Sequence, residues 1–318
     1  MTSRVQFKRY IDCFPVYWQV AMVTRLVIPF FYHLYRRPLR SRKDIELSAV
    51  ERRKSRRAAM YDMMFGELLK AYSEMVGAKL HPETAQMLYL MRRLAREHDD
   101  EFERRSVTGE SLARDDVLAA EKVQECRERF SEFVSRSIDP QIIVSYLRSL
   151  FEEHYQEHLD RWEAARQDPT PESVRSVLEL DSGLQLVATM DCIALFNGHK
   201  LQPAIQKQFH HLGMAGKMAN DMTDLGYDVS ERVPNFLHAI LLQYPEEWDI
   251  AREAGKAVGS KGKKWWLKNC PASIQEFFAE IELHYSQINS VRLKCSCDLM
   301  VWPTIVGFDY KNKRRSHA

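Results

Sequence analysis

The sequence predicts an all-α fold, on three observations. Its 318 residues include only 12 Gly and 12 Pro, the residues that most disfavour helix interiors. Apolar residues recur with the 3.6-residue period of a helix along nearly the whole chain, and almost no segment alternates with the two-residue period of a strand. No repeat, low-complexity tract or long polar linker divides it. We therefore expect a single-domain helical bundle whose facing helices enclose a central apolar cavity.

Glycine and proline positions set the expected helix boundaries, because glycine is favoured just after a helix and proline in its first turn. Gly77 and Gly109 should follow the first two helices, and Pro140 should open the fourth. Gly259 and Gly262, among several lysines, predict a mobile basic loop over 255–268. The expected helices span 48–76, 82–105, 111–135, 140–167, 171–196 and 203–228, and Pro234, Pro245 and Pro271 mark later starts.

Composition excludes several classes of function. The formal charge of +2 gives no reason to expect nucleic acid as a partner. Six cysteines without paired spacing indicate reduced thiols and a cytoplasmic protein. The apolar segment 16–35 is interrupted by Arg25 and Pro29, so it does not read as a membrane span. We expect residues 1–45 to form an amphipathic, basic segment packed on a helical domain of 46–318, with peripheral membrane contact as the alternative.

Two segments carry helically spaced oxygen ligands. In the segment 220–228, Asn220, Asp224 and Asp228 recur every four residues, which places them on one helix face. Upstream, Asp99 and Glu103 lie four apart, and Asp100 precedes Glu103 by three. Carboxylate and amide oxygens suit Mg²⁺, which keeps water and phosphate oxygens as its other ligands. Two such helices facing each other would hold several Mg²⁺ ions and a phosphate-bearing substrate.

These segments resemble the metal motifs of bacterial class I terpene synthases, also called terpene cyclases. The second motif of that family has the form Asn-Asp-x-x-Ser/Thr-x-x-x-Glu, and Asn220, Asp221, Asp224 and Asp228 take its four defined positions, with Asp replacing Ser/Thr and Glu. The first motif, Asp-Asp-x-x-Asp/Glu, resembles residues 99–103. The gap between the two motifs is also close to the family's usual one.

Further stretches extend the resemblance over about residues 80–310. The family commonly has a helix with a Trp, then a Pro-initiated helix that breaks at a Gly. Trp162, Pro169 and the Asp-Ser-Gly segment 181–183 follow in that order. Near the end, Trp302 and the pair Asp309-Tyr310 resemble the family's closing Trp and Arg-Tyr pair. For the helix break and the cavity wall, the resemblance and the positions along the chain indicate Asp181, Gly183, Phe65 and Trp302.

The chain departs from the family pattern at three diphosphate contacts. Leu178 stands where the family has a diphosphate-sensing Arg, although Arg175 lies one turn earlier on the same helix face. Tyr227 stands where the family often has Lys or Arg, and Asp309 replaces the Arg of the closing pair. These changes raise the alternative of a changed substrate or impaired activity. The residues expected to contact diphosphate are Arg175, Lys217 and Tyr310.

The resemblance implies Mg²⁺-dependent ionisation of a linear isoprenyl diphosphate, farnesyl or geranylgeranyl, followed by cyclisation of the allylic cation and release of diphosphate. Three Mg²⁺ ions, replaceable by Mn²⁺, would neutralise the leaving group. The expected metal ligands are Asp99, Asp100, Glu103, Asn220, Asp224 and Asp228. A homodimer is compatible with the sequence, and the prenyl chain length and product are not readable from it.

Three alternatives stay open. An isoprenyl chain-elongating or head-to-head prenyltransferase would use two Asp-rich motifs, whereas the second motif here opens with Asn. A degenerate cyclase that only binds isoprenoids is the non-enzyme alternative. Finally, the segment 154–158 spells His-x-x-Glu-His, the inverted zinc-peptidase pattern, with His154 and His158 four apart on one helix.

Overall fold

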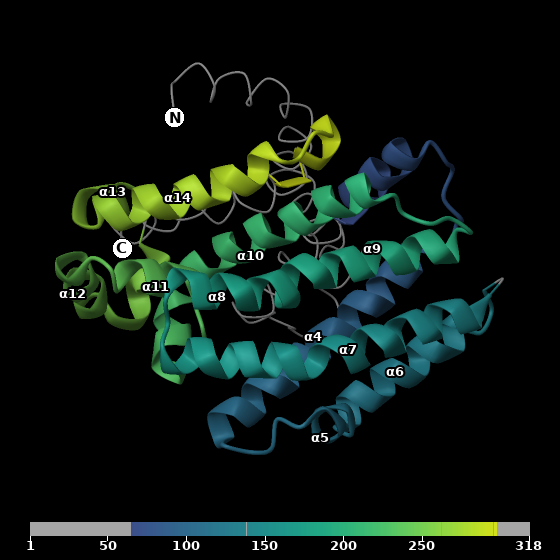
Figure 1. The fold of residues 1–318 in the computed structure, drawn as a ribbon, viewed down its shortest axis with the longest axis horizontal. Coiled ribbons are helices and arrows are strands. Elements are labelled where there is room, and N and C mark those ends of the chain that lie inside the picture. The colour runs from purple at the N-terminus through teal and green to yellow at the C-terminus, as the bar shows by residue number, and fades with distance from the viewer. Residues whose placement is uncertain (1–64, 138, 262, 295, 298–318) are drawn as a thin grey trace, which may run out of the picture.

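The computed structural model describes residues 65–137, 139–261, 263–294 and 296–297, and within them the fold is all-α, as predicted (Figure 1). Residues 65–76, 291–294 and 296–297 are helical as well. The bounded elements are α4 (Thr84–Thr108), α5 (Arg114–Leu118), α6 (Glu121–Val134), α7 (Pro140–Gln167), α8 (Pro171–Leu178), the π-helical turn η2 (Glu179–Leu184), α9 (Gln185–Phe196), α10 (Pro203–Glu231), α11 (Phe236–Leu241), α12 (Pro245–Glu253), the 3₁₀ turn η3 (Gly255–Ser260), α13 (Lys263–Asn269) and α14 (Pro271–Ser286).

Most helix ends lie where glycine and proline predict them. Gly77 and Gly109 adopt φ of 66° and 73°, the left-handed conformation that ends a helix and that residues with a Cβ rarely take. Proline occupies the first turn of α7, α8, α10, α12 and α14. The missing N–H of proline costs nothing there, because that donor has no partner within the helix. The predicted boundaries of these helices are therefore confirmed to within a few residues.

The single helix expected over 111–135 is wrong, because two helices, α5 and α6, replace it. The break falls at Ala119 and Ala120, and Ala120 has extended backbone angles. Val117 and Val123 on either side are both fully buried. Six residues of continuous helix, at about 100° each, would turn these two side chains to different faces. The break allows both valines to enter the core.

The basic loop expected over 255–268 is also wrong, since η3 and α13 cover most of this segment. A Cβ added at Gly259 would lie 2.1 Å from the carbonyl oxygen of Thr223, so only glycine permits this approach of η3 to α10. Trp266 on α13 is fully buried. The segment is therefore held at both ends by packing, which its many lysines did not lead us to expect.

The helix that begins at Pro171 and ends at Phe196 contains a π-helical turn. The turn η2 joins α8 to α9 without a loop. Here η2 touches α10 directly, because a Cβ on Gly213 would lie 2.2 Å from the carbonyl oxygen of Ser182. Gly183 of η2 lies under the imidazole of His210, which also belongs to α10, and a Cβ added to Gly183 would come within 2.5 Å of that ring. Two glycines therefore fix the depth at which η2 meets α10.

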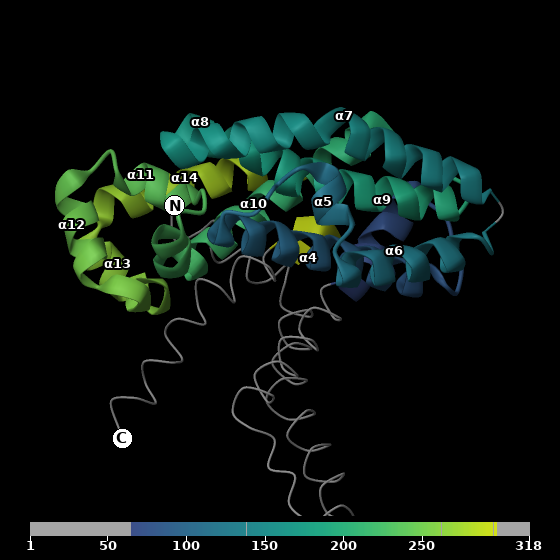
Figure 2. The same ribbon diagram turned by 90° about the horizontal axis from the view of Figure 1, so that it is seen from below.

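Helix α10 lies in the interior of the bundle and organises it. It packs against α9, η2, α11, η3 and α14, and Figure 1 shows it between α14 on one side and α8 and α9 on the other. Helices α4 and α6 pack on each other and form the layer opposite α7 and α8 (Figure 2). Fully buried side chains of α10, including Phe209, Met214, Met218 and Leu225, contribute to the core.

Within the described residues, no helix is long and apolar enough to cross a bilayer. The predicted segment 1–45, and the predicted site residues Trp302, Asp309 and Tyr310, lie outside the described residues. The division of the chain at residue 45 stays a prediction.

Candidate functional site

A cavity of about 600 Å³ lies among α4, α6, α7, α9, η2 and α10. More of its wall is apolar than polar, and the aromatic part comes from α4, α6 and α7. Phe102 and Trp162 meet edge to face there, with ring centroids 5.4 Å apart. Nine charged residues also line it: Asp99 and Glu103 of α4, Arg114 and Asp115 of α5, Arg127 of α6, Arg148 and Glu152 of α7, Asp181 of η2 and Lys217 of α10. The cavity thus combines aromatic and charged groups, which suits a ligand that has an apolar and an ionic part.

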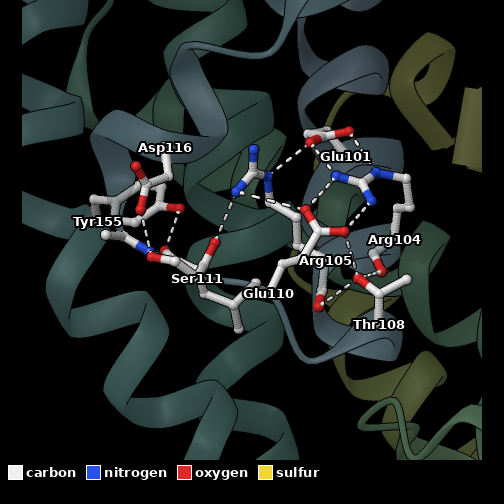
Figure 3. Close-up of polar contacts among 10 residues, drawn as sticks. Glu101, Arg104, Arg105, Thr108, Glu110, Ser111, Asp116 and Tyr155 are labelled. Atoms are coloured by element: carbon white, nitrogen blue, oxygen red, sulfur yellow. Dashed lines mark hydrogen bonds and ion pairs between the residues drawn. The ribbon is translucent and has the colours of Figure 1, made fainter.

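Helix geometry divides the acidic segment of α4 between the cavity and the surface. Asp99 and Glu103, one turn apart, line the cavity. Asp100 is exposed and lies 3.5 Å from Arg96. Glu101 accepts hydrogen bonds from Arg104 and Arg105, which are drawn in Figure 3. The Arg104 guanidinium lowers the pKa of Glu101 to about 2. Glu101 is therefore ionised and bound to these two arginines.

The two cavity carboxyls of α4 are in a setting that disfavours their charge. Burial raises the pKa of Asp99, and the nearby Asp181 adds to this, while a hydrogen bond with His98 opposes it. Burial also raises the pKa of Glu103, with Lys217 opposing the shift. Groups that carry charge at such a cost gain from a cation brought among them.

The α10 segment presents its three predicted ligands at different depths. Asn220 is exposed, Asp224 is half-buried and Asp228 is buried. The amide of Asn220 donates to Asp224 Oδ2 over 2.7 Å. Burial raises the pKa of Asp228 to about 8, with the charge of Asp221 as the second cause. None of these three is part of the cavity wall.

Asn235 and Asp221 form a buried network beneath the α10 segment, and sequence reasoning missed the role of Asn235. The Asn235 amide donates to Asp228 Oδ2 over 2.7 Å and to the Asp221 carbonyl oxygen over 2.8 Å. The Phe236 N–H donates to Asp221 Oδ2 over 2.8 Å. Asn235 is fully buried and is the N-cap residue of α11. The available signal was an Asn directly after Pro234, where a helix was expected to start.

Lys217 occupies the space between the acidic segments. Its Nζ lies 3.5 Å from Oδ1 of the fully buried Asp221. Burial opposes the charge of Lys217, but Asp221, Asp181, Asp228 and Glu103 outweigh it and raise the pKa of Lys217 above its ordinary value. The Lys217 amine is therefore fully protonated.

Electrostatic interactions link side chains of α4, η2 and α10 across this region. Glu103 of α4 acts on Lys217 and on the Tyr227 hydroxyl of α10. Asp181 of η2 acts on Asp99 and Asp221. Among the described residues, no group of three or more His, Cys, Asp or Glu lies close enough together to hold a metal ion by itself. The donors still fit Mg²⁺, because this ion is usually held by one or two carboxylates together with waters and substrate phosphates.

Arg175 and Phe65 do not line the cavity, unlike Asp181 and Lys217. Arg175 forms an ion pair with Glu280 of α14 at 3.0 Å and lies over the Phe236 ring. Phe65 is half-buried beneath the Arg92 guanidinium. Gly183 serves the packing of η2 under His210. The aromatic residues found in the wall, Phe102, Phe130, Tyr155 and Trp162, are not the ones that sequence position suggested for the cavity.

The zinc-peptidase alternative gains no support from the geometry. His154 and His158 both line the cavity, but Glu157 lies 3.3 Å from His154 and is bonded to Arg161. The ring of His158 packs on Phe102, with centroids 5.6 Å apart. A catalytic zinc ion needs three protein ligands, and among the described residues no Asp, Glu, His or Cys completes a set of three with these two imidazoles.

No protein-family model matches this chain, and no curated protein matches it significantly.

Proposed function

We propose that the protein is a class I terpene synthase, a Mg²⁺-dependent lyase that releases diphosphate from a linear isoprenyl diphosphate and cyclises the resulting allylic cation. One observation carries the proposal. Carboxylates from α4, η2 and α10 lie within electrostatic range of one another, and Asp99, Glu103 and Asp181 among them belong to the wall of a cavity that is largely apolar and aromatic.

Each part of the cavity has a task in this reaction. Mg²⁺ held by the carboxylates supplies Lewis acidity toward the diphosphate oxygens. Asp99 and Glu103 in the cavity wall would hold the ion, and Asn220, Asp224 and Asp228, which lie on α10 outside the wall, would supply further ligands. Lys217 donates hydrogen bonds to the diphosphate as charge develops on it. Phe102 and Trp162 present ring faces and edges to the hydrocarbon, and an aromatic face stabilises a cation by about 0.5–2 kcal/mol.

Exclusion of water is the second requirement, because a carbocation reacts with any nucleophile that reaches it. The apolar wall from Met91, Leu147, Leu180 and Ala188 offers no nucleophile to the hydrocarbon chain. The polar groups of the wall near Asp181 lie where the diphosphate would bind. The carboxylates that would hold Mg²⁺ gather where α4 and η2 meet Lys217 of α10, so the diphosphate would bind at that side of the cavity.

The test is release of inorganic diphosphate from C10, C15, C20 and C25 prenyl diphosphates with Mg²⁺, followed by mass analysis of the extract. We expect release with at least one chain length and a cyclic hydrocarbon or alcohol as product. Asp99→Ala and Asn220→Ala should each abolish turnover and preserve the helical circular dichroism spectrum. Asp249→Ala is the matched control, because Asp249 is an exposed aspartate of α12 that pairs, among the described residues, only with the neighbouring Arg252.

The product separates the alternatives. A longer linear diphosphate, formed only when isopentenyl diphosphate is added, would assign the chain to the elongating prenyltransferases. Binding of a prenyl diphosphate without release at any chain length would assign it to isoprenoid binding. Wild-type rates in both Asp99→Ala and Asn220→Ala would refute the assignment of the site.

A further inference from the structure

Lys217 is placed where the two acidic segments and the helix break meet. Its charge acts on Asp99 and Glu103 of α4 and on Asp221 and Asp228 of α10. Its own charge is favoured by Asp181 of η2. Carboxylates of three separate elements thus act electrostatically on one ammonium group, in the region where the proposed function requires divalent cations.

Asp221 holds this ammonium in position. Asp221 Oδ1 lies 3.5 Å from Lys217 Nζ and accepts no hydrogen bond from the described residues. The other oxygen of Asp221 is held by the Phe236 N–H at 2.8 Å. Asp221 is fully buried, whereas the Lys217 side chain keeps 24% of its surface exposed and lines the cavity. Asp221 therefore anchors a cation that a ligand in the cavity can reach.

We propose that Lys217 is a built-in cation that competes with divalent metal ions for the acidic segments until diphosphate binds. Without substrate, its ammonium neutralises part of the carboxylate charge and keeps metal affinity low. When diphosphate enters, the anchored ammonium donates to the diphosphate oxygens, whose charge offsets its own, and the carboxylates become available to metal. This proposal rests on the proposed function and specifies how the two ligands of the site depend on each other.

The physical basis is the competition between like charges. An ammonium within a few ångströms of a carboxylate repels a divalent cation brought to the same group, and the repulsion is large where water is partly excluded. Diphosphate removes this repulsion by offering the ammonium a stronger partner. Because coupling between two ligands is reciprocal, bound metal must strengthen diphosphate binding by the same factor.

The experiment is calorimetric titration of Mg²⁺ into the full-length protein, without and with saturating inorganic diphosphate, for wild type, Lys217→Met and Lys217→Gln. In the wild type, diphosphate should raise Mg²⁺ affinity by about tenfold or more. In both variants, Mg²⁺ alone should bind about tenfold more tightly than to wild type, and the effect of diphosphate should fall to a few-fold. Lys207→Met is the matched control, because Lys207 is an exposed lysine of the same helix, and it should behave as wild type.

The outcomes separate this inference from the proposed function. If wild type binds Mg²⁺ and diphosphate cooperatively but Lys217→Met and Lys217→Gln bind Mg²⁺ alone no more tightly than wild type, the role of Lys217 is refuted and the proposed function stands. If wild type binds neither Mg²⁺ nor diphosphate, both are refuted. Circular dichroism checks folding, and Lys217→Gln, which retains a polar group beside Asp221, carries the comparison if Lys217→Met does not fold.

Discussion

Gly213 provides the sharpest test of the packing between α10 and the π-helical turn. Changing it to alanine would place a Cβ 2.2 Å from the Ser182 carbonyl oxygen and 3.3 Å from the Gly183 Cα. Both neighbours are backbone atoms, so η2 and α10 must separate by about 1 Å to restore van der Waals contact. Overpacking of this kind costs about 1–3 kcal/mol. The better helix propensity of alanine returns up to about 1 kcal/mol.

We therefore expect Gly213→Ala to lower the free energy of unfolding by about 1–2 kcal/mol. In a domain of this size, that corresponds to a fall in Tm of about 2–8 °C, measurable by calorimetry or by circular dichroism at 222 nm. Gly66→Ala is the matched comparison. Gly66 is also helical, and no described atom lies within 4 Å of its added Cβ. That variant should keep or raise Tm.

The difference in Tm between Gly213→Ala and Gly66→Ala tests whether the close approach of α10 to η2 constrains the fold. If Gly213→Ala is as stable as Gly66→Ala, the close approach of α10 to Ser182 does not constrain the fold. The reasoning that two glycines fix the depth at which η2 meets α10 would then be refuted.

Three further predictions concern buried polar groups. Asn235→Ala should destabilise the fold by about 2–4 kcal/mol in urea unfolding, because it removes one hydrogen bond to the Asp228 carboxylate and one to a backbone carbonyl; a loss below about 0.5 kcal/mol would contradict the network. Burial raises the pKa of Asp228 to about 8, above its unfolded value, so its contribution to stability is lost as pH rises from about 4 to 8. The stability of Asp228→Asn relative to wild type should therefore increase over that range. A difference in stability between the two proteins that does not change with pH would contradict this. Burial lowers the pKa of His284 to about 4, so its contribution is lost as pH falls from about 6.5 to 4. The Tm of His284→Gln should fall less than that of wild type between about pH 7 and pH 5, whereas parallel profiles would contradict the assignment.

The sequence supports the prediction of the helices better than that of their interruptions. Pro140, Pro203 and Pro271 open helices where expected because proline acts locally, through its fixed φ and its missing donor. The break between α5 and α6 has no such local cause. It depends on Val117 and Val123 finding the same core, which is a property of the assembled bundle. The anchoring of η3 likewise depends on Gly259 meeting Thr223, a contact between distant segments.

The candidate site shows the same division. Helical spacing correctly places Asp99 and Glu103 on one face, and both line the cavity. Spacing alone cannot tell which acids of the segment 99–103 face inward. Asp100 and Glu101 lie beside arginines instead of the cavity. The supporting role of Asn235 depends on how the chain returns from α10 to α11. Sequence therefore predicts which residue types gather at the site, while tertiary packing determines which of them enter the cavity.

The π-helical turn between α8 and α9 has a consequence for how this segment tolerates insertions and deletions. Such a turn accommodates one residue more than an α-helix would over the same length. Removing one residue between Glu179 and Leu184 would therefore return the segment to a regular helix and leave the residues that follow in nearly the same orientation. Ala188, which borders the cavity, would keep its place, together with the rest of α9. The same deletion within the regular part of α9 would rotate the residues after it by about 100° and present others to the cavity, so the π-helical turn is the place where this segment best tolerates a deletion of one residue.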